Sequence, residues 1–320
     1  MVRNLELERR LADHPDDRES YEVLADWLQT QGDPRGELIA LVLRAEQAPS
    51  AGLATQISAH EQRHANELRG AGFAGALQWR RGFVSHVSLD RARLTATVAE
   101  VLDAILAHPS GALVDGIQIF DTSPTATLAK TLDVIARRAP RSLRMVQLLV
   151  DAELPSLSAF DRLPHLATLA IERAPGTGGL GYGNLFGPGL GLTPEAMRQI
   201  AHAEWPLHRL VLDLGYGRAT FADMRPLFVR DDLAITELRI NAPIPDRARD
   251  ALGTDLCRAL VASPLAGQLE AIELNLELSS ANYRALVEGR HRFARLRRLA
   301  LPSRKQTERV LDRSARGYDR

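Results

Sequence analysis

Residues 207–241, LHRLVLDLGYGRATFADMRPLFVRDDLAITELRIN, hold two copies of the pattern that decides the fold. In each copy an apolar residue is followed by a second one three positions later and by a third one two positions after that. The two copies are Leu207/Leu210/Leu212 and Ile235/Leu238/Ile240. The last two apolar positions of a copy share one face of a β-strand, because successive side chains of a strand point to opposite faces. Each copy therefore predicts a short strand with one buried face.

The same pattern recurs from residue 84 to residue 301, eight times in all. The other copies are Val84/Val87/Leu89, Val114/Ile117/Ile119, Leu143/Val146/Leu148, Leu166/Leu169/Ile171, Leu269/Ile272/Leu274 and Leu296/Leu299/Leu301. Segments with helical character separate several copies, namely Thr95–Ala107, Thr125–Arg138, Pro194–Ala203 and Asp246–Ala262. Strand–helix units of about 28 residues stack with parallel strands on one side and helices on the other.

The first 82 residues have a different, helical character. Leu5–Ala12 begins one helix, and Asp16 or Asp17 can cap a second that ends near Gly32. Asp33 and Pro34 then provide an N-cap and a first-turn proline for a third helix. We expect this module to cover the exposed end of the repeats.

The repeated pattern resembles the leucine-rich repeats, and more closely their helix-bearing kind, found in ribonuclease inhibitor and Ran GTPase-activating protein. The resemblance covers residues 83–303 and implies an α/β leucine-rich-repeat solenoid, with parallel strands on the concave side and helices outside. The Asn or Cys ladder position after the strand is mostly absent from this chain, although Asn241 and Asn275 follow two of the strands.

A second resemblance concerns the N-terminal module. The stretch Pro15–Leu41, with Ala25-Asp26-Trp27-Leu28 and Gly32-Asp33-Pro34-Arg35, is similar to the bacterial repeat-companion domain. That family implies no activity. The expected organisation is a helical cap at 1–82, about eight repeats at 83–303 with a glycine-rich insertion at 174–192, and a basic segment at 304–320.

Composition limits the classes of function. With 45% hydrophobic and 25% charged residues the chain is of ordinary globular composition, and its formal net charge is zero. The charge balance argues against overall attraction to nucleic acid, although residues 290–320 are strongly basic. No apolar run is long enough for a membrane span, and the N-terminus has no signal-peptide core. A single cysteine, Cys257, favours a reducing compartment, and we expect a cytoplasmic protein.

Two motifs with chemical meaning occur in the chain. His60-Glu61-Gln62-Arg63-His64 matches the H-E-x-x-H zinc motif, but Arg63 puts a cation inside it and a third ligand is missing. Gly176-x-Gly178-x-x-Gly181 matches the dinucleotide motif, but no helix begins at its last glycine. We therefore expect residues 60–64 to form a solvated helix face and the glycine motif to lie in a flexible insertion. We expect no catalytic residue, no metal and no cofactor.

Two further sets of residues allow a structural and a functional interpretation. Asp26, Trp27 and Arg35 could form a recognition site, but Trp27 shares a helical face with apolar residues, which favours a structural role. Cys257 lies among leucines of a predicted helix and is expected in the core.

The candidate binding surface consists of the strand residues that alternate with the apolar ones. Because adjacent strands lie about 4.8 Å apart, Arg209 is expected to meet Glu237, and Arg239 to meet Glu273. Apolar side chains occupy the same face in other copies. These are Phe120, Met145, Leu149 and Val211. They are either covered by the N-terminal module or the insertion, or they form a partner-binding patch with a charged rim.

The sequence thus predicts a non-enzymatic scaffold that binds a protein partner on its concave face. The partner's identity and the oligomeric state stay open, and neither a membrane nor nucleic acid is the expected partner. Two alternatives remain. One is regulation of a small GTPase, by analogy with the helix-bearing repeats, and the other is nucleic-acid binding through the basic C-terminal end.

Overall fold

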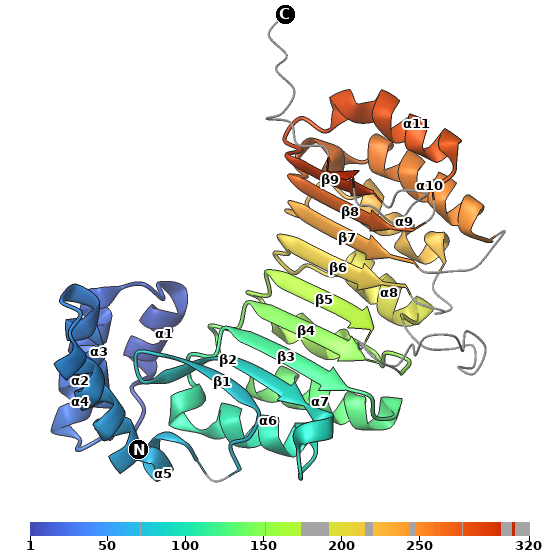
Figure 1. The fold of residues 1–320 in the computed structure, drawn as a ribbon. Helices are drawn as coiled ribbons and strands as arrows, with labels where there is room; N and C mark the ends of the chain where they lie inside the picture. The colour runs from blue at the N-terminus through green and yellow to red at the C-terminus, as the bar shows by residue number, and fades with distance from the viewer. Residues whose placement is uncertain are drawn as a thin grey trace, which may run out of the picture. The chain divides into compact units, whose positions relative to one another are not determined.

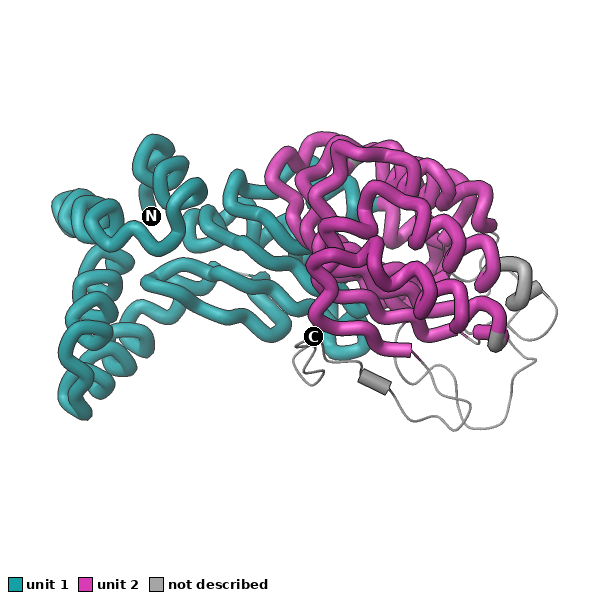
Figure 2. Tube along the Cα trace, turned by 90° about the horizontal axis from the view of Figure 1, so that it is seen from above, with its two compact units in different colours: residues 1–120, 130–146 teal, residues 121–129, 147–320 magenta. Residues whose placement is uncertain are grey.

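A computed structural model describes residues 1–70, 72–150, 152–173, 192–214, 220–242, 248–276, 278–301 and 309–310. The fold is α/β, with a mostly parallel sheet whose strands alternate with helices along the chain (Figure 1). The residues form two compact units (Figure 2). Unit 1 comprises residues 1–120 and 130–146, and unit 2 comprises residues 121–129 and 147–320.

The helices alternate with strands only after residue 90. The α-helices are α1 (Leu5–Asp13), α2 (Arg18–Thr30), α3 (Pro34–Gln47), α4 (Ala51–Arg63), α5 (Ala65–Leu68), α6 (Val98–Ala107), α7 (Thr125–Arg138), α8 (Pro194–His202), α9 (Phe221–Val229), α10 (Ala248–Ala262) and α11 (Ser280–Glu288). Short 3-10 turns are η1 (Arg91–Arg93), η2 (Pro109–Gly111), η3 (Ser158–Arg162), η4 (Pro264–Gly267) and η5 (Gly289–Arg292). The strands are β1 (Ala76–Arg80), β2 (Phe83–Asp90), β3 (Gly116–Asp121), β4 (Met145–Val150), β5 (Thr168–Arg173), β6 (Arg209–Asp213), β7 (Glu237–Asn241), β8 (Ala271–Asn275), β9 (Arg298–Leu301) and β10 (Arg309–Val310).

The helices of unit 1 begin where the sequence places capping side chains. Asp17 accepts a hydrogen bond from the Ser20 backbone N–H at the start of α2, and Asp33 accepts one from Arg35 at the start of α3. Helices α1 to α3 share an apolar core with Phe83 of β2. The hydrogen bonds that Asp17 and Asp33 accept confirm the predicted caps.

A hairpin that the sequence did not predict joins the helices of unit 1 to its sheet. Strand β1 pairs antiparallel with β2, and the turn between them has positive φ at Arg81 (47°) and Gly82 (79°). Two consecutive residues of positive φ are typical of the type I′ turn, whose twist suits a hairpin. Strand β2 then pairs parallel with β3.

In unit 2 the strands β5 to β9 are parallel, ordered as in the chain, and paired in register. Helices α8 to α11 lie on one side of these strands (Figure 1). The apolar residues that alternate along each strand are buried, for example Leu210 and Leu212 of β6. Strand β10 pairs antiparallel with β9.

Each of the eight copies of the sequence pattern forms a strand. Strand β6 begins at Arg209 and β7 at Glu237, two residues after the first apolar residue of the copy. The first apolar residues, Leu207 and Ile235, are buried in the turns that lead into these strands. The predicted positions of the strands are therefore confirmed.

Candidate functional site

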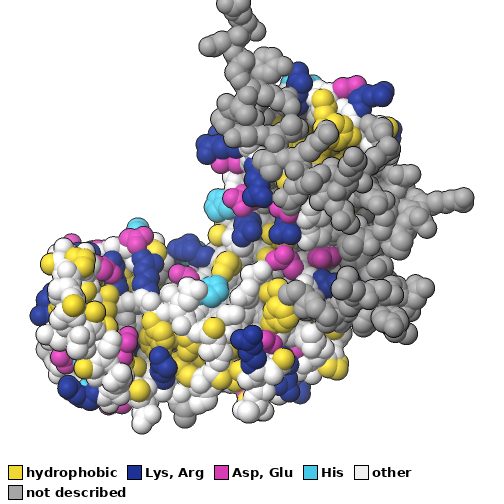
Figure 3. Space-filling view, in the orientation of Figure 1, with side chains coloured by type: hydrophobic (Ala, Val, Ile, Leu, Met, Phe, Trp, Pro, Cys, Tyr) yellow, Lys and Arg dark blue, Asp and Glu magenta, His cyan; other side chains and the backbone are white. Residues whose placement is uncertain are grey.

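The polar side of strands β6 to β9 carries charged residues at matching positions. Parallel pairing places Arg209 beside Glu237, and Glu237 beside Ala271, which pairs in turn with Arg298. Two residues further along each strand, Arg239 lies between Val211 and Glu273. Basic and acidic side chains are interleaved over these strands (Figure 3). We call Arg209, Glu237, Arg239, Glu273 and Arg298, together with Glu172 of β5, the charged face.

The two ion pairs expected from the sequence are present. Arg209 Nε lies 3.2 Å from Glu237 Oε2, and Arg239 Nε lies 3.1 Å from Glu273 Oε1. The first pair is about half exposed at both side chains, whereas the Glu273 side chain is only 18% exposed. Strand register alone accounts for both contacts, because in-register neighbours of a sheet bring their side chains together.

Glu273 is the centre of a larger polar network. Its Oε1 also accepts a hydrogen bond of 2.9 Å from Asn275 Nδ2, and its Oε2 lies 3.8 Å from Arg298 Nη2. Asn275 Nδ2 in addition donates to Asn241 Oδ1 at 2.7 Å. Residues at the same strand positions in consecutive copies of the pattern thus form one continuous network.

Arg239 extends the network toward β5. Its Nη1 lies 3.8 Å from Glu172 Oε2, and its Nε donates to Asn241 Oδ1 at 3.3 Å. The Glu172 carboxylate also accepts a hydrogen bond of 2.7 Å from Gln147 Nε2. Glu172 and Arg298 were not among the predicted partner-binding residues, although they follow the same alternation along their strands.

A hollow of about 50 Å³ opens in the charged face. Ala271 lies between the longer side chains of Glu237 and Arg298, so its short side chain leaves space. The lining also includes Arg209, Val211, Arg239 and Glu273. We call this feature the Ala271 hollow.

The apolar residues of the predicted site are divided between the two units. Phe120 and Met145 are half-buried in unit 1, and Leu149 is half-buried in unit 2. For Val211 the sequence left open whether the side chain is covered or exposed, and in the structure it is buried, with an exposure of only 2%. Its short side chain lies low in the sheet between the longer Arg209 and Arg239, with which it lines the hollow.

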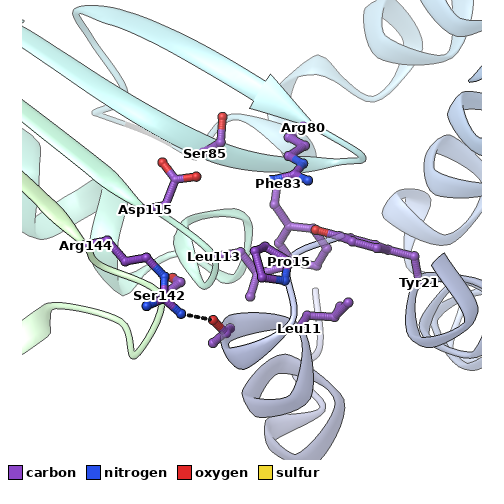
Figure 4. A pocket seen from close by; sticks show the side chains of 11 residues that line it. Leu11, Pro15, Tyr21, Arg80, Phe83, Ser85, Leu113, Asp115, Ser142 and Arg144 are labelled. Carbon is purple, nitrogen blue, oxygen red and sulfur yellow. Dashed lines mark hydrogen bonds between the residues drawn. The ribbon is translucent and has the colours of Figure 1, made fainter. Parts of the chain in front are cut away.

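Unit 1 contains a separate cavity of about 50 Å³ (Figure 4). Leu11, Pro15 and Tyr21 line it from the helical part, Ser85 from β2, and Asp115 from the position before β3 (Figure 4). Burial raises the pKa of Asp115, and the nearby His86, Arg80 and Arg144 oppose this rise only in part. Arg144 closes one wall of the cavity by donating to the carbonyl oxygen of Ala12 at 3.0 Å.

The two histidines of the H-E-x-x-H motif differ in environment. His60 is buried, and its Nε2–H donates to the carbonyl oxygen of Pro34 at 2.8 Å. Its Nδ1 faces the Glu37 carboxylate at 3.3 Å. His64 Nδ1 lies 3.0 Å from Glu67 Oε1, and the two imidazole rings are 4.7 Å apart. His60 thus connects α4 to the start of α3 and is not part of a solvated face, which corrects the expectation for this residue.

The side chain of Arg35 has a structural role in the interior of unit 1. It is fully buried, and its guanidinium donates to both carboxylate oxygens of Asp33, at 3.1 and 2.9 Å. It also donates to the carbonyl oxygens of Val2 and Pro109. Trp27 packs against the apolar core of unit 1, whereas Asp26 is exposed. Asp26, Trp27 and Arg35 therefore form no common surface.

Cys257 is buried in α10, and burial raises the pKa of its thiol to about 12. A thiol of this kind stays protonated and is a poor nucleophile. Among the described residues, no group of three or more His, Cys, Asp or Glu side chains is placed to hold a metal ion. The G-x-G-x-x-G motif and all of the segment 304–320 except residues 309–310 lie outside the described residues.

In the part of the chain that the structure describes, every helix is too short or too polar to span a lipid bilayer. Neither a family model nor a curated protein matches this sequence.

Proposed function

We propose that the chain is a leucine-rich-repeat solenoid with an N-terminal repeat-companion module, and that it acts as a non-enzymatic scaffold for a protein partner. The parallel strands, the helices on one side and the regular apolar pattern support the repeat assignment. The single cysteine, Cys257, is buried and unpaired, which fits a cytoplasmic role.

The observation that carries the functional proposal is the charged face of unit 2. The Arg209–Glu237 ion pair is exposed, and such a pair contributes only about 0–1 kcal/mol to stability, so folding does not require it. A rigid sheet that presents alternating charges in fixed register is suited to selecting a partner, since electrostatic complementarity contributes chiefly to specificity and association rate.

The test exchanges the two members of one ion pair. In the double variant Arg209→Glu/Glu237→Arg the pair is kept, but the pattern presented to a partner is reversed. Proteins retained by the immobilised wild-type chain from a lysate of cells that make it are identified by mass spectrometry. We expect at least one of them to be lost on the exchanged variant, with an unchanged melting temperature.

The matched control exchanges a pair outside the charged face. Arg137 and Asp133 form an exposed ion pair of 2.8 Å on α7, and Asp133→Arg/Arg137→Asp changes the charge pattern there to the same extent. A partner that binds the charged face is retained by this control variant. Equal retention by the wild type and both exchanged variants would remove the charged face as the binding site.

A further inference from the structure

The Ala271 hollow has more positive than negative groups around it. Its lining contains three guanidinium groups, of Arg209, Arg239 and Arg298, and two carboxylates, of Glu237 and Glu273. The carboxylates are central to the ion pairs of the face, whereas two of the guanidinium groups are only partly engaged. The residues that line the hollow therefore carry one more positive than negative charge, although the charged face as a whole, with Glu172 beside Arg239, is balanced.

Arg209 and Arg298 are these two partly engaged arginines. Arg209 contacts Glu237 through Nε at 3.2 Å, and the contact of Arg298 with Glu273 is long, at 3.8 Å. Their side chains are 50% and 57% exposed. Since a guanidinium has five N–H donors, both residues can donate to a further acceptor at the hollow.

The basic character continues at the same edge of the sheet. Arg295 and Arg297 line a second hollow with Glu270, directly before β8 and β9. Arg297 is 80% exposed, and its nearest carboxylate, on Glu270, is 3.7 Å away. Arg290 and Arg292 in the preceding turn are exposed as well. Arginines thus extend from the Ala271 hollow along the turn before β9.

We propose that the partner presents an acidic segment and that one of its carboxylate side chains enters the Ala271 hollow, where it accepts hydrogen bonds from Arg209 and Arg298. This inference rests on the proposed scaffold function and specifies the chemistry of the partner. Neighbouring acidic residues of the segment face Arg295 and Arg297. Paired guanidinium donors suit a carboxylate because their planar geometry matches its two oxygens.

The interleaved carboxylates favour a protein segment over nucleic acid. A phosphate backbone brings closely spaced negative charges, and Glu237 and Glu273 would repel it at the centre of the face. Single-strand binding also relies on exposed aromatic side chains for base stacking, and Phe293, the aromatic residue of the basic turn, is buried. A single side-chain carboxylate meets the same two glutamates, but it brings only one negative charge, for which Arg209 and Arg298 provide two positive partners.

The experiment measures binding of labelled probes to the full chain by fluorescence anisotropy at low salt. The probes are octaglutamate, octalysine and a single-stranded DNA octanucleotide. We expect octaglutamate to bind most tightly and the variant Arg209→Ala/Arg298→Ala to weaken its binding by about tenfold or more, because two charge-assisted hydrogen bonds are lost. Arg298→Lys keeps the charge without the paired donors and should fall between the wild type and this variant.

The matched control removes two exposed arginines from helices. Arg225→Ala/Arg284→Ala changes the net charge equally but leaves the charged face intact, so octaglutamate binding should change less than twofold. If both double variants weaken octaglutamate binding equally, the effect comes from the net charge alone and the proposal is overturned. Tighter binding of the octanucleotide would overturn it in favour of nucleic acid.

Tighter binding of octalysine would overturn the acidic assignment but leave the scaffold function intact. A failure of the scaffold proposal itself would give a different result. The wild type and the variant with the exchanged Arg209–Glu237 pair would then capture the same cellular proteins equally.

Discussion

At the scale of single residues, the pair Asp33 and Arg35 combines three tasks. Asp33 caps α3, balances a fully buried guanidinium and accepts a hydrogen bond of 3.0 Å from the backbone N–H of Val2. The ring of Phe83 lies beneath the guanidinium, with 5.1 Å between Arg35 Cζ and the ring centroid. Burial would raise the pKa of Asp33, but the hydrogen bond and charge of Arg35 outweigh it and hold the pKa below its ordinary value.

Removal of the Asp33 carboxylate should therefore be costly. We expect Asp33→Ala to lower the free energy of unfolding by about 3–5 kcal/mol, because it leaves a buried charge without its partner. Urea unfolding at pH 7 measures this loss. The matched control is Asn4→Ala, which removes only a cap, the bond of 3.1 Å from Leu7 N–H to Asn4 Oδ1, and should cost about 1 kcal/mol.

The effect of Asp33 also depends on pH in a defined direction. A carboxyl whose pKa is lower in the folded state stabilises the protein fully above its unfolded pKa, and this stabilisation is lost as the pH falls through the folded pKa. The difference between wild type and Asp33→Ala should thus shrink in acid. A difference that stays constant down to the lowest pH at which the protein folds would contradict the assigned role of the charge.

At the scale of elements, two glycines in helices have opposite environments. A Cβ at Gly36 of α3 would lie 2.6 Å from both the Ala25 carbonyl oxygen and the Gln29 backbone nitrogen of α2. Gly36 therefore allows these two helices to approach closely. A Cβ at Gly52 of α4 would meet nothing closer than 4.0 Å.

The two glycine-to-alanine variants should change stability in opposite directions. Gly36→Ala should destabilise the protein, because the backbones of α2 and α3 would have to separate, and this outweighs the better helix propensity of alanine. Gly52→Ala should stabilise it by up to about 1 kcal/mol, since only the propensity changes. Thermal unfolding of both variants beside the wild type measures the difference, and a stabilised Gly36→Ala would mean that the helices do not pack this closely.

At the scale of the whole molecule, the single cysteine reports on opening of the structure. Cys257 is fully buried and its pKa is about 12, so a thiol reagent reaches a reactive thiolate only when α10 opens. We expect slow labelling under native conditions, with a rate that rises with denaturant in parallel with global unfolding.

Thr55→Cys provides an internal control for this measurement. Thr55 is exposed on α4, so a cysteine there should react at once in the folded protein. If Cys257 reacts as quickly as the cysteine at position 55, or at a rate independent of denaturant, then α10 opens locally and its apolar packing is weaker than its burial indicates.

The sequence by itself determined the strands and the ion pairs between them. An apolar alternation is a local property, so it fixes which residues face the interior and which stand on the other side of each strand. Because the copies are similar and their strands pair in parallel register, equal positions become neighbours, as with Arg209 and Glu237 or Arg239 and Glu273. The caps at Asp17 and Asp33 are local in the same sense.

Only the tertiary structure decided what covers each side chain and where space remains. The burial of Val211, the hollow above Ala271 and the complete enclosure of Arg35 depend on the length and position of side chains from other segments. The first two of these features depend on neighbouring strands, and the third depends on segments as far apart as residues 2 and 109. No periodicity in the sequence encodes such contacts, because they arise only when distant segments pack together.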